Sequence, residues 1–175
     1  MAFAVELALS LEAAVHVREI WTALAEAGLD YMAQCGAGPH ISLVLWDDVD
    51  PPSAKRALES FAQETPPIEV SLVGVDHFGD VAVYLAPAPA PDLVAVHRRF
   101  YERFGRLGAN PSPYYAPGAW VPHCTLAMDF TPETTTTALA VARRARLPIT
   151  GRLERIELIQ YRPVQLRHSV PLAGR

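Results

Sequence analysis

Two short segments of the chain repeat one pattern whose residues could do acid–base chemistry. They are Pro39-His40-Ile41-Ser42-Leu43 and Pro122-His123-Cys124-Thr125-Leu126. Side chains alternate between the two faces of a β-strand, so each histidine and the hydroxyl residue two positions later are expected on the same face. Two such faces turned toward each other would place two imidazoles and two hydroxyls around one small anion. The repeat therefore predicts a site for cleaving a phosphodiester.

This reaction needs a base for the attacking oxygen and an acid for the departing one. Histidine suits both roles, because its reference pKa of about 6.5 leaves both protonation states available near neutrality. The hydroxyls of Ser42 and Thr125 can donate hydrogen bonds to the non-bridging phosphate oxygens, where negative charge must be stabilised. The sequence does not assign the acid and the base between His40 and His123.

The specificity of the pattern depends on its length. The short form, His-x-Ser/Thr, is a weak signal in a chain with six histidines, because such a match is expected by chance. The longer form, with proline before and leucine after in both copies, is much more specific. Half-buried structural histidines beside ordinary strand hydroxyls remain the alternative, and the two matched copies favour a paired site.

A metal site is the obvious rival to this interpretation. Cys35, His40, His123 and Cys124 include plausible zinc ligands, but neighbouring residues of a strand point to opposite faces, and the spacing fits no compact Cys/His module. The chain also lacks the Gly-x-Ser-x-Gly nucleophile elbow and the glycine-rich loops of Walker and Rossmann type. We therefore expect no metal, no cofactor and no serine nucleophile.

The elements that must position the motifs follow from apolar periodicity, caps and chain breakers. Strands are expected at Phe3–Leu9, His40–Trp46, Ile68–Val75, Val81–Ala86, Trp120–Met128, Ile156–Tyr161 and Gln165–Pro171. Helices are expected at Leu11–Ala27, Ser53–Gln63, Asp92–Phe104 and Thr131–Arg146. Each motif then lies in a strand that is followed by a helix, at corresponding places in two halves. An internal duplication with a pseudo-twofold axis explains this order.

Strand alternation also predicts which side chains line the site. His40, Ser42 and Val44 are expected on one face, with Ile41, Leu43 and Leu45 in the core; likewise His123, Thr125 and Ala127 oppose Cys124, Leu126 and Met128.

Several aromatic and basic residues could contact a substrate. Tyr114, Tyr115 and Trp120 lie in or next to the long loop 105–119 before the second motif, where a base could stack on them at roughly 1–3 kcal/mol. Tyr161 and Arg162, near a strand end, are candidates for base or phosphate contacts. Ordinary packing is an equal alternative for each of them.

The remaining histidines and arginines favour structural or solvated roles. The histidines are His16, His77, His97 and His168, which lie in predicted helices, a hairpin turn and the last strand. Arg98, Arg99, Arg103 and Arg106 form one cluster, for which a solvated helix face is favoured over the lining of a substrate site.

Composition bounds the partners and the compartment. The 175 residues fit one domain over residues 1–175, with two lobes. A net charge of −4 argues against wrapping long duplex nucleic acid, so we expect a small nucleotide or an RNA end as partner. The first ten residues do not resemble a signal peptide, no apolar run approaches a membrane span, and two cysteines favour a reducing cytoplasm. A monomer is expected.

The two motifs resemble those of the 2H phosphoesterase superfamily, most closely its 2′-5′ RNA ligase / 2′,3′-cyclic phosphodiesterase-like branch. The resemblance covers nearly the whole chain. It includes the strand and connector Val81–Ala90 before Leu93–His97, and the segment Tyr115-Ala116-Pro117-Gly118-Ala119-Trp120 that leads into the second motif.

The resemblance implies an α+β, bilobal fold in which two antiparallel sheets form a central cleft with helices outside. It implies His40 and His123 as catalytic residues and Ser42 and Thr125 as phosphate ligands. In the family, Thr is commoner than Ser at the position of Ser42, but Ser keeps the hydroxyl. The implied activity is metal-independent opening of 2′,3′-cyclic phosphates of nucleotides or RNA ends, with reverse 2′-5′ ligation in some members. The alternatives are an AMP-like nucleotide-binding module with little turnover and a cyclic phosphodiesterase for ADP-ribose-derived substrates.

Overall fold

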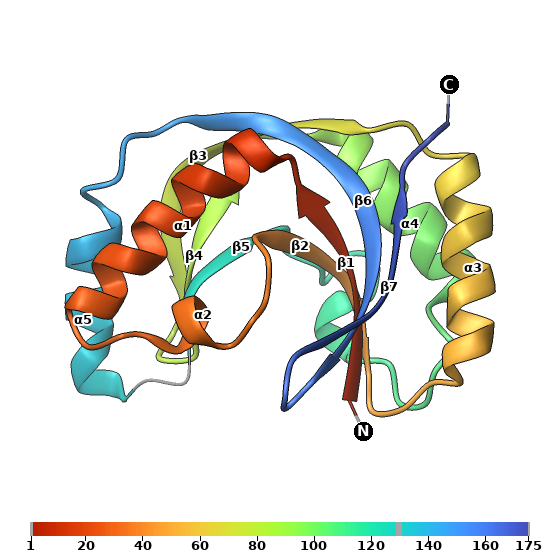
Figure 1. Ribbon diagram of the computed structural model, residues 1–175, viewed down its shortest axis with the longest axis horizontal. Coiled ribbons are helices and arrows are strands. Elements are labelled where there is room, and N and C mark those ends of the chain that lie inside the picture. The colour runs from red at the N-terminus through yellow and green to blue at the C-terminus, as the bar shows by residue number, and fades with distance from the viewer. Residues whose placement is uncertain (1, 129–130, 175) are drawn as a thin grey trace.

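The computed structural model describes residues 2–128 and 131–174 (Figure 1). Its strands are β1 (Ala2–Leu9), β2 (His40–Trp46), β3 (Ile68–Phe78), β4 (Ala82–Pro87), β5 (Cys124–Met128), β6 (Ile149–Tyr161) and β7 (Gln165–Pro171). Its helices are α1 (Leu11–Glu26), α2 (Tyr31–Gln34), α3 (Pro51–Gln63), α4 (Pro91–Phe104) and α5 (Pro132–Ala142). The predicted domain 1–175 therefore includes a few residues outside the described part.

The described strands form one antiparallel sheet in the order β2-β1-β6-β3-β4-β5, with β7 paired to β6. Strand β6 connects the two halves of this sheet. It pairs with β1 along one edge, and along the other edge with β3 at Ile149–Leu153 and with β7 at Arg155–Gln160. The predicted α+β class with antiparallel strands is confirmed, and the two expected sheets are joined by β6 into one.

The helices cover the two halves separately. Helix α1 contacts β6, β5 and α5, whereas α3 contacts β6 and β7 and α4 contacts β2. Figure 1 shows α1 and α5 over one half of the sheet and α3 and α4 over the other. Helix α3 illustrates the local cause: the Asp50 side chain accepts from the Ser53 amide at 3.0 Å, two prolines occupy the first turn, and buried Ala54, Leu58 and Phe61 recur at helical spacing.

Several predicted boundaries differ from the structure. Strand β3 continues to Phe78, so that His77 lies in this strand and not in a turn, and the short helix α2 was not predicted. Three further differences have a clear local reason. Strand β6 begins at Ile149 and not Ile156, because its polar first half pairs with β3. Strand β5 begins at Cys124 and not Trp120, since Pro122 has no amide to donate to a ladder. Helix α5 ends at Ala142 and not Arg146, because the amides of Arg144 and Ala145 bond carbonyls three residues earlier and not four.

The core lies between the sheet and its helices, and close packing there requires a small residue on β6. A Cβ atom added to Gly151 would lie 2.6 Å from the Cβ of Ala13 on α1.

None of the described helices is long and apolar enough to cross a membrane.

Candidate active site

The fold brings the two motif strands together although they lie at opposite ends of the strand order. Strands β2 and β5 contact each other, and the backbone amide of His40 hydrogen-bonds the thiol of Cys124. His40 is the first residue of β2, and His123 immediately precedes β5. Burial lowers the pKa of His123, and a charge on His40 lowers it further. The two imidazoles are therefore electrostatic neighbours.

Both histidines have the same local geometry. Nδ1 of His40 lies 2.6 Å from the carbonyl oxygen of Gly38, and Nδ1 of His123 lies 2.7 Å from that of Val121. A carbonyl only accepts, so Nδ1 carries the hydrogen in each ring. The neutral form of either histidine then presents Nε2 as a basic lone pair, which is the form that a general base requires.

Each motif strand also contains a β-bulge at the same motif position. Along β2 the pairing with β1 passes from Ser42 to Val44, and along β5 the pairing with β4 passes from Thr125 to Ala127. The residue skipped is the motif leucine in both cases, Leu43 or Leu126. Bulges of this kind redirect the side chains that follow.

These bulges correct part of the predicted division of faces. Val44 and Ala127 were expected on the site face, but both are buried in the core, while Leu45 and Met128 are partly exposed. The alternation from the histidine to the leucine agrees with the prediction, since Ile41, Leu43, Cys124 and Leu126 are fully buried. The bulge reverses the faces only after the hydroxyl residue.

Two tryptophans hold the motif strands through matched hydrogen bonds. The indole of Trp120 donates to the carbonyl of Ser42, and that of Trp21 donates to the carbonyl of Thr125, both at 3.0 Å. Strands β2 and β5 are the ends of the sheet, where backbone groups need other partners. Trp120 was predicted as a substrate contact, and its indole N–H is used structurally. Trp21 was not predicted; it lies in α1 among apolar neighbours that give no site signal.

Sequence reasoning missed Glu6, which lies against His40. Glu6 stands opposite Ser42 in the pairing of β1 with β2, its side chain is 3% exposed, and its Oε2 lies 3.2 Å from Nε2 of His40. Burial, and then the charge of Glu157, raises the pKa of Glu6 well above its usual range. Burial lowers the pKa of His40, against the opposing effects of Gly38 and Glu157. The available signal was a lone carboxylate in the apolar strand 2–9.

The corresponding place beside His123 holds aromatic rings, which were also missed. Tyr84 stands opposite Thr125 in the pairing of β4 with β5. The rings of Phe78 and Tyr84 lie 5.0 and 5.4 Å from the His123 ring, centroid to centroid. His123 thus has an apolar, aromatic environment, in contrast to the carboxylate beside His40.

Tyr115 is a predicted substrate contact that the fold places against a motif hydroxyl. Its hydroxyl is hydrogen-bonded to the Ser42 side chain, and burial raises its pKa to about 12, with Tyr161 and Glu6 adding to the effect. The phenol is therefore neutral near pH 7. Its backbone carbonyl is held by Nε2 of His97 at 3.0 Å, and the His97 ring stacks on Trp120 at 3.8 Å.

The other predicted contacts lie farther along this surface. Tyr161 is a neighbour of Tyr115, and its pKa is raised by burial and lowered by Arg162. Arg162 is exposed beside it, at the end of β6. Tyr114 is 79% exposed.

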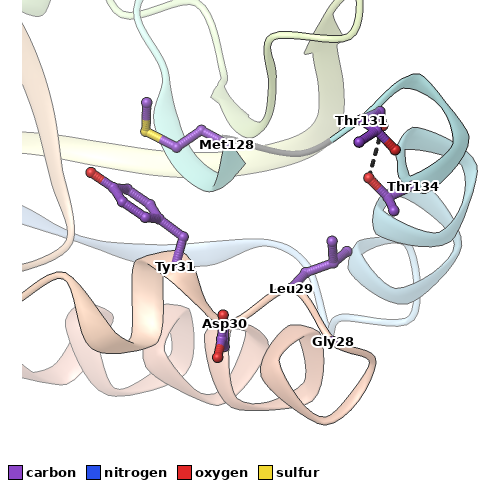
Figure 2. A pocket seen from close by; sticks show the side chains of 7 residues that line it. All are labelled: Gly28, Leu29, Asp30, Tyr31, Met128, Thr131 and Thr134. Carbon is purple, nitrogen blue, oxygen red and sulfur yellow. Dashed lines mark hydrogen bonds between the residues drawn. The ribbon is translucent and has the colours of Figure 1, made fainter.

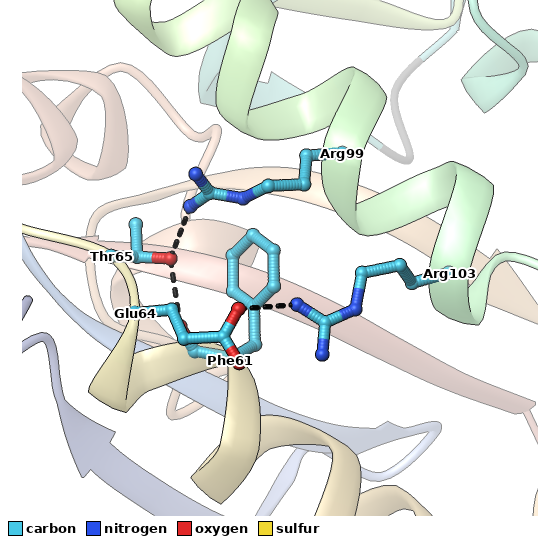
Figure 3. A network of polar contacts seen from close by, with 5 residues as sticks. All are labelled: Phe61, Glu64, Thr65, Arg99 and Arg103. Atoms are coloured by element: carbon cyan, nitrogen blue, oxygen red, sulfur yellow. Dashed lines mark hydrogen bonds and ion pairs between the residues drawn. The ribbon is translucent and has the colours of Figure 1, made fainter.

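Two members of the arginine cluster, Arg99 and Arg103, make contacts between helices. Arg99 donates to the hydroxyl of Thr65 and lies over the Phe61 ring at 4.9 Å, while Arg103 pairs with Glu64 at 2.6 Å (Figure 3). These contacts join α4 to the end of α3. Among the other histidines, His16 lies 3.2 Å from Glu19 and Nδ1 of His77 bonds a carbonyl of its own hairpin.

Among the described residues, no group of three or more His, Cys, Asp or Glu side chains could hold a metal ion. Cys124 is buried in the core, where burial raises its pKa to about 12, and Cys35 is a free thiol on α2's C-terminal side.

A cavity of about 210 Å³ lies between the loop after α1, the end of β5 and the start of α5 (Figure 2). Neither motif histidine lines this cavity.

The comparisons with known proteins identify the family of the chain and proteins of similar fold. A sequence model of the 2′-5′ RNA ligase superfamily matches residues 9–165. The fold is similar to TT0787 of Thermus thermophilus, with a TM-score of 0.66 and 15% identity over all of both chains. It is also similar to E. coli LigT complexed with 3′-AMP, with a TM-score of 0.56 and 16% identity over 97% of this chain and 94% of that one.

A third similar structure is Kluyveromyces marxianus Usb1 with uridine monophosphate, with a TM-score of 0.50 and 13% identity over 98% of this chain and 97% of that one. At these identities the structural matches establish the shared fold alone. No curated protein sequence matches the chain.

Proposed function

The chain belongs to the 2′-5′ RNA ligase superfamily of 2H phosphoesterases, and on this basis we propose that it is a phosphodiesterase that opens 2′,3′-cyclic phosphates of nucleotides or RNA ends. The observation that carries the proposal is the paired geometry of His40 and His123. Each ring has its Nδ1 hydrogen held by a carbonyl two residues earlier, so that Nε2 is the nitrogen left for proton transfer.

In the proposed reaction one histidine takes a proton from water as the water oxygen attacks phosphorus. The other donates a proton to the ribose oxygen that leaves. The hydroxyls of Ser42 and Thr125 bind the non-bridging oxygens, where negative charge builds up. Each well-placed acid or base contributes about 10²–10⁴ in rate, and none of these steps requires a metal ion. Reversal with a 5′-hydroxyl in place of water would be a 2′-5′ ligation.

The proposed partners are a small nucleotide or an RNA end. Similar folds have been solved with 3′-AMP and uridine monophosphate, and the net charge of −4 does not favour long nucleic acid. Tyr115 and Tyr161 are the proposed base contacts, with Arg162 as a phosphate contact. Both cysteines are free thiols, which favours a cytoplasmic location. We also propose that the protein is a monomer of one two-lobed domain.

Assays of the EDTA-treated protein test the proposal. We expect turnover of 2′,3′-cyclic AMP and of an oligonucleotide ending in a 2′,3′-cyclic phosphate, undiminished by EDTA. A cyclic phosphate of ADP-ribose belongs in the same panel. Faster turnover of this compound would change the proposed substrate and leave the proposed reaction as it is. Absence of hydrolysis across the panel would contradict the proposal.

A nucleotide-binding module with little turnover is the second candidate. It is favoured by one contact: Glu6 already occupies the Nε2 side of His40. Calorimetry that shows tight binding of AMP, together with no hydrolysis across the panel, would establish this alternative.

A further inference from the structure

The two halves of the site differ at one pair of corresponding positions. Glu6 stands opposite Ser42 across β1 and β2, and Tyr84 stands opposite Thr125 across β4 and β5. The next strand repeats the correspondence, because Glu157 is opposite Glu6 and Asp76 is opposite Tyr84. One histidine therefore has a carboxyl group as its neighbour, and the other has an aromatic ring.

The contact between Glu6 and His40 requires a hydrogen. Nδ1 of His40 donates to Gly38, so Nε2 and the Glu6 Oε2 face each other at 3.2 Å. Without a hydrogen between them, two sets of lone pairs would meet in a buried place, where charge is poorly screened. Either the carboxylic acid donates to Nε2 or the imidazolium donates to the carboxylate. In both arrangements the His40–Glu6 pair holds one proton more than a neutral histidine.

His123 has no comparable partner. Within the described part of the chain its Nε2 takes part in no hydrogen bond or ion pair, and the rings of Phe78 and Tyr84 pack beside it. Aromatic surroundings and a nearby charge on His40 both favour the neutral imidazole. The His40–Glu6 pair thus holds the proton that a general acid must give, and His123 presents the lone pair that a general base must use.

We propose that Glu6 is a positioning residue that retains a proton at His40, so that His40 is the acid and His123 the base of the reaction. The assignment rests on the proposed function for its reaction. It also rests on an independent structural detail, because Oε1 of Glu6 is buried without a hydrogen-bond partner among the described residues. A carboxyl group is costly to bury in this way, and a proton on it lowers that cost.

The protons balance over the reaction. Water attacks phosphorus and gives a proton to Nε2 of His123. As the bond from phosphorus to the leaving ribose oxygen breaks, that oxygen takes the place of the Glu6 Oε2 at Nε2 of His40 and accepts the proton of the His40–Glu6 pair. One proton has then moved from the His40–Glu6 pair to His123, and exchange with solvent restores the starting state.

Groups from each neighbouring element determine the pH at which the His40–Glu6 pair loses its proton. Glu157 on β6 raises the pKa of Glu6, and Arg155 lies 3.7 Å from Glu157. The hydroxyls of Tyr115 and Tyr161 and the thiol of Cys124 also lie near Glu6 or its neighbours, and all three have raised pKa values. They stay neutral near pH 7, so Glu157 and His123 are the neighbours whose charges act on the His40–Glu6 pair.

Nuclear magnetic resonance on histidine-labelled protein tests the inference without a substrate. We expect the His40 ring resonances of the wild type to titrate at least one pH unit higher than those of Glu6→Gln, with the His123 titration unchanged. The amide keeps the shape of Glu6 but cannot share its proton. Glu157→Gln should shift the His40 titration in the same direction by a smaller amount, which also serves if Glu6→Gln does not fold.

The matched control is Asp76→Asn. Asp76 is the residue of the other half that corresponds to Glu157, and its substitution should leave the His40 titration unchanged. Rates supply the second readout: the alkaline limb of kcat/KM for 2′,3′-cyclic AMP should move to lower pH in Glu6→Gln, with a loss of at least tenfold at pH 8. An unchanged His40 titration, or an equal loss of rate at every pH, would overturn the inference. A shifted titration in a protein without turnover would uphold Glu6 and refute the proposed function.

Discussion

Four side chains carry the proposed chemistry, and each is held by its own backbone neighbourhood. His40 and His123 use the carbonyl two residues before them to fix the ring, and the bulge at Leu43 or Leu126 follows the hydroxyl residue. A fixed ring needs little reorganisation when a proton moves, which is the physical content of a preorganised site. The sequence pattern therefore encodes geometry as well as residue types.

Removing the motif hydroxyls should slow the reaction and leave the fold intact. We expect Ser42→Ala and Thr125→Val each to lower kcat/KM for 2′,3′-cyclic AMP by about 10²-fold, since each loses a donor to the charged phosphate oxygens. Thr125→Ser keeps the hydroxyl and should lose less than about fivefold. Thermal unfolding checks that the variants fold, and equal losses in Thr125→Ser and Thr125→Val would count against the phosphate role.

The motif strands could be predicted because their information is local. Residues 40–43 alternate polar and apolar side chains, residues 43–46 form an apolar run, and the boundaries of β2 agree with the prediction. The bulges, by contrast, depend on the partner strands β1 and β4, and the position of Glu6 beside His40 depends on pairing across the sheet. Such contacts are decided by tertiary structure, which a single sequence does not display. The polar start of β6 was missed for the same reason.

The loop before the second motif depends on His97 in α4, and this dependence should appear in the pH dependence of stability. Burial lowers the pKa of His97 from 6.5 to about 4, against the opposing effects of two backbone carbonyls. The unfolded chain therefore binds this proton first as pH falls, and the free energy of unfolding decreases between pH 6.5 and pH 4. Between pH 6.5 and pH 4 the protonation of His97 lowers the free energy of unfolding by about 3 kcal/mol.

Chemical denaturation of wild type and His97→Phe across this range provides the measurement. Phenylalanine retains a ring to stack on Trp120 but loses the hydrogen bond to Tyr115, so it should be less stable at pH 7 by about 1–3 kcal/mol. Its stability should then fall less steeply toward pH 4. Parallel curves for the two proteins would show that His97 is not the titrating group.

Across the whole molecule, each half supplies parts to the other. The loop before the second motif packs on β2 of the first half through Trp120, and α1 of the first half reaches β5 through Trp21. Strand β6 runs through both halves of the sheet. The motifs are thus held in place only by the complete fold. The matched bulges and indole hydrogen bonds support the proposed duplication.

The acidic surface charge gives a prediction for the size of the substrate. A cyclic nucleotide carries one phosphate charge, so kcat/KM for 2′,3′-cyclic AMP should change by less than about fivefold between 50 and 200 mM KCl. An enzyme that used six to ten phosphate contacts along an RNA would lose about 10³–10⁵ in affinity over this range. A steep salt dependence for a long RNA, combined with faster turnover than the mononucleotide, would contradict a small-substrate site.

The most direct test of the paired acid–base site is the pH dependence of 2′,3′-cyclic AMP hydrolysis by EDTA-treated wild type, His40→Ala and His123→Ala. We predict a bell-shaped profile for the wild type across pH 5–9 and a loss of about 10²–10⁴ in each variant at the wild-type optimum. Thermal unfolding and AMP binding should show that the variants are folded. A flat wild-type profile, or wild-type rates in either folded variant, would contradict the paired site.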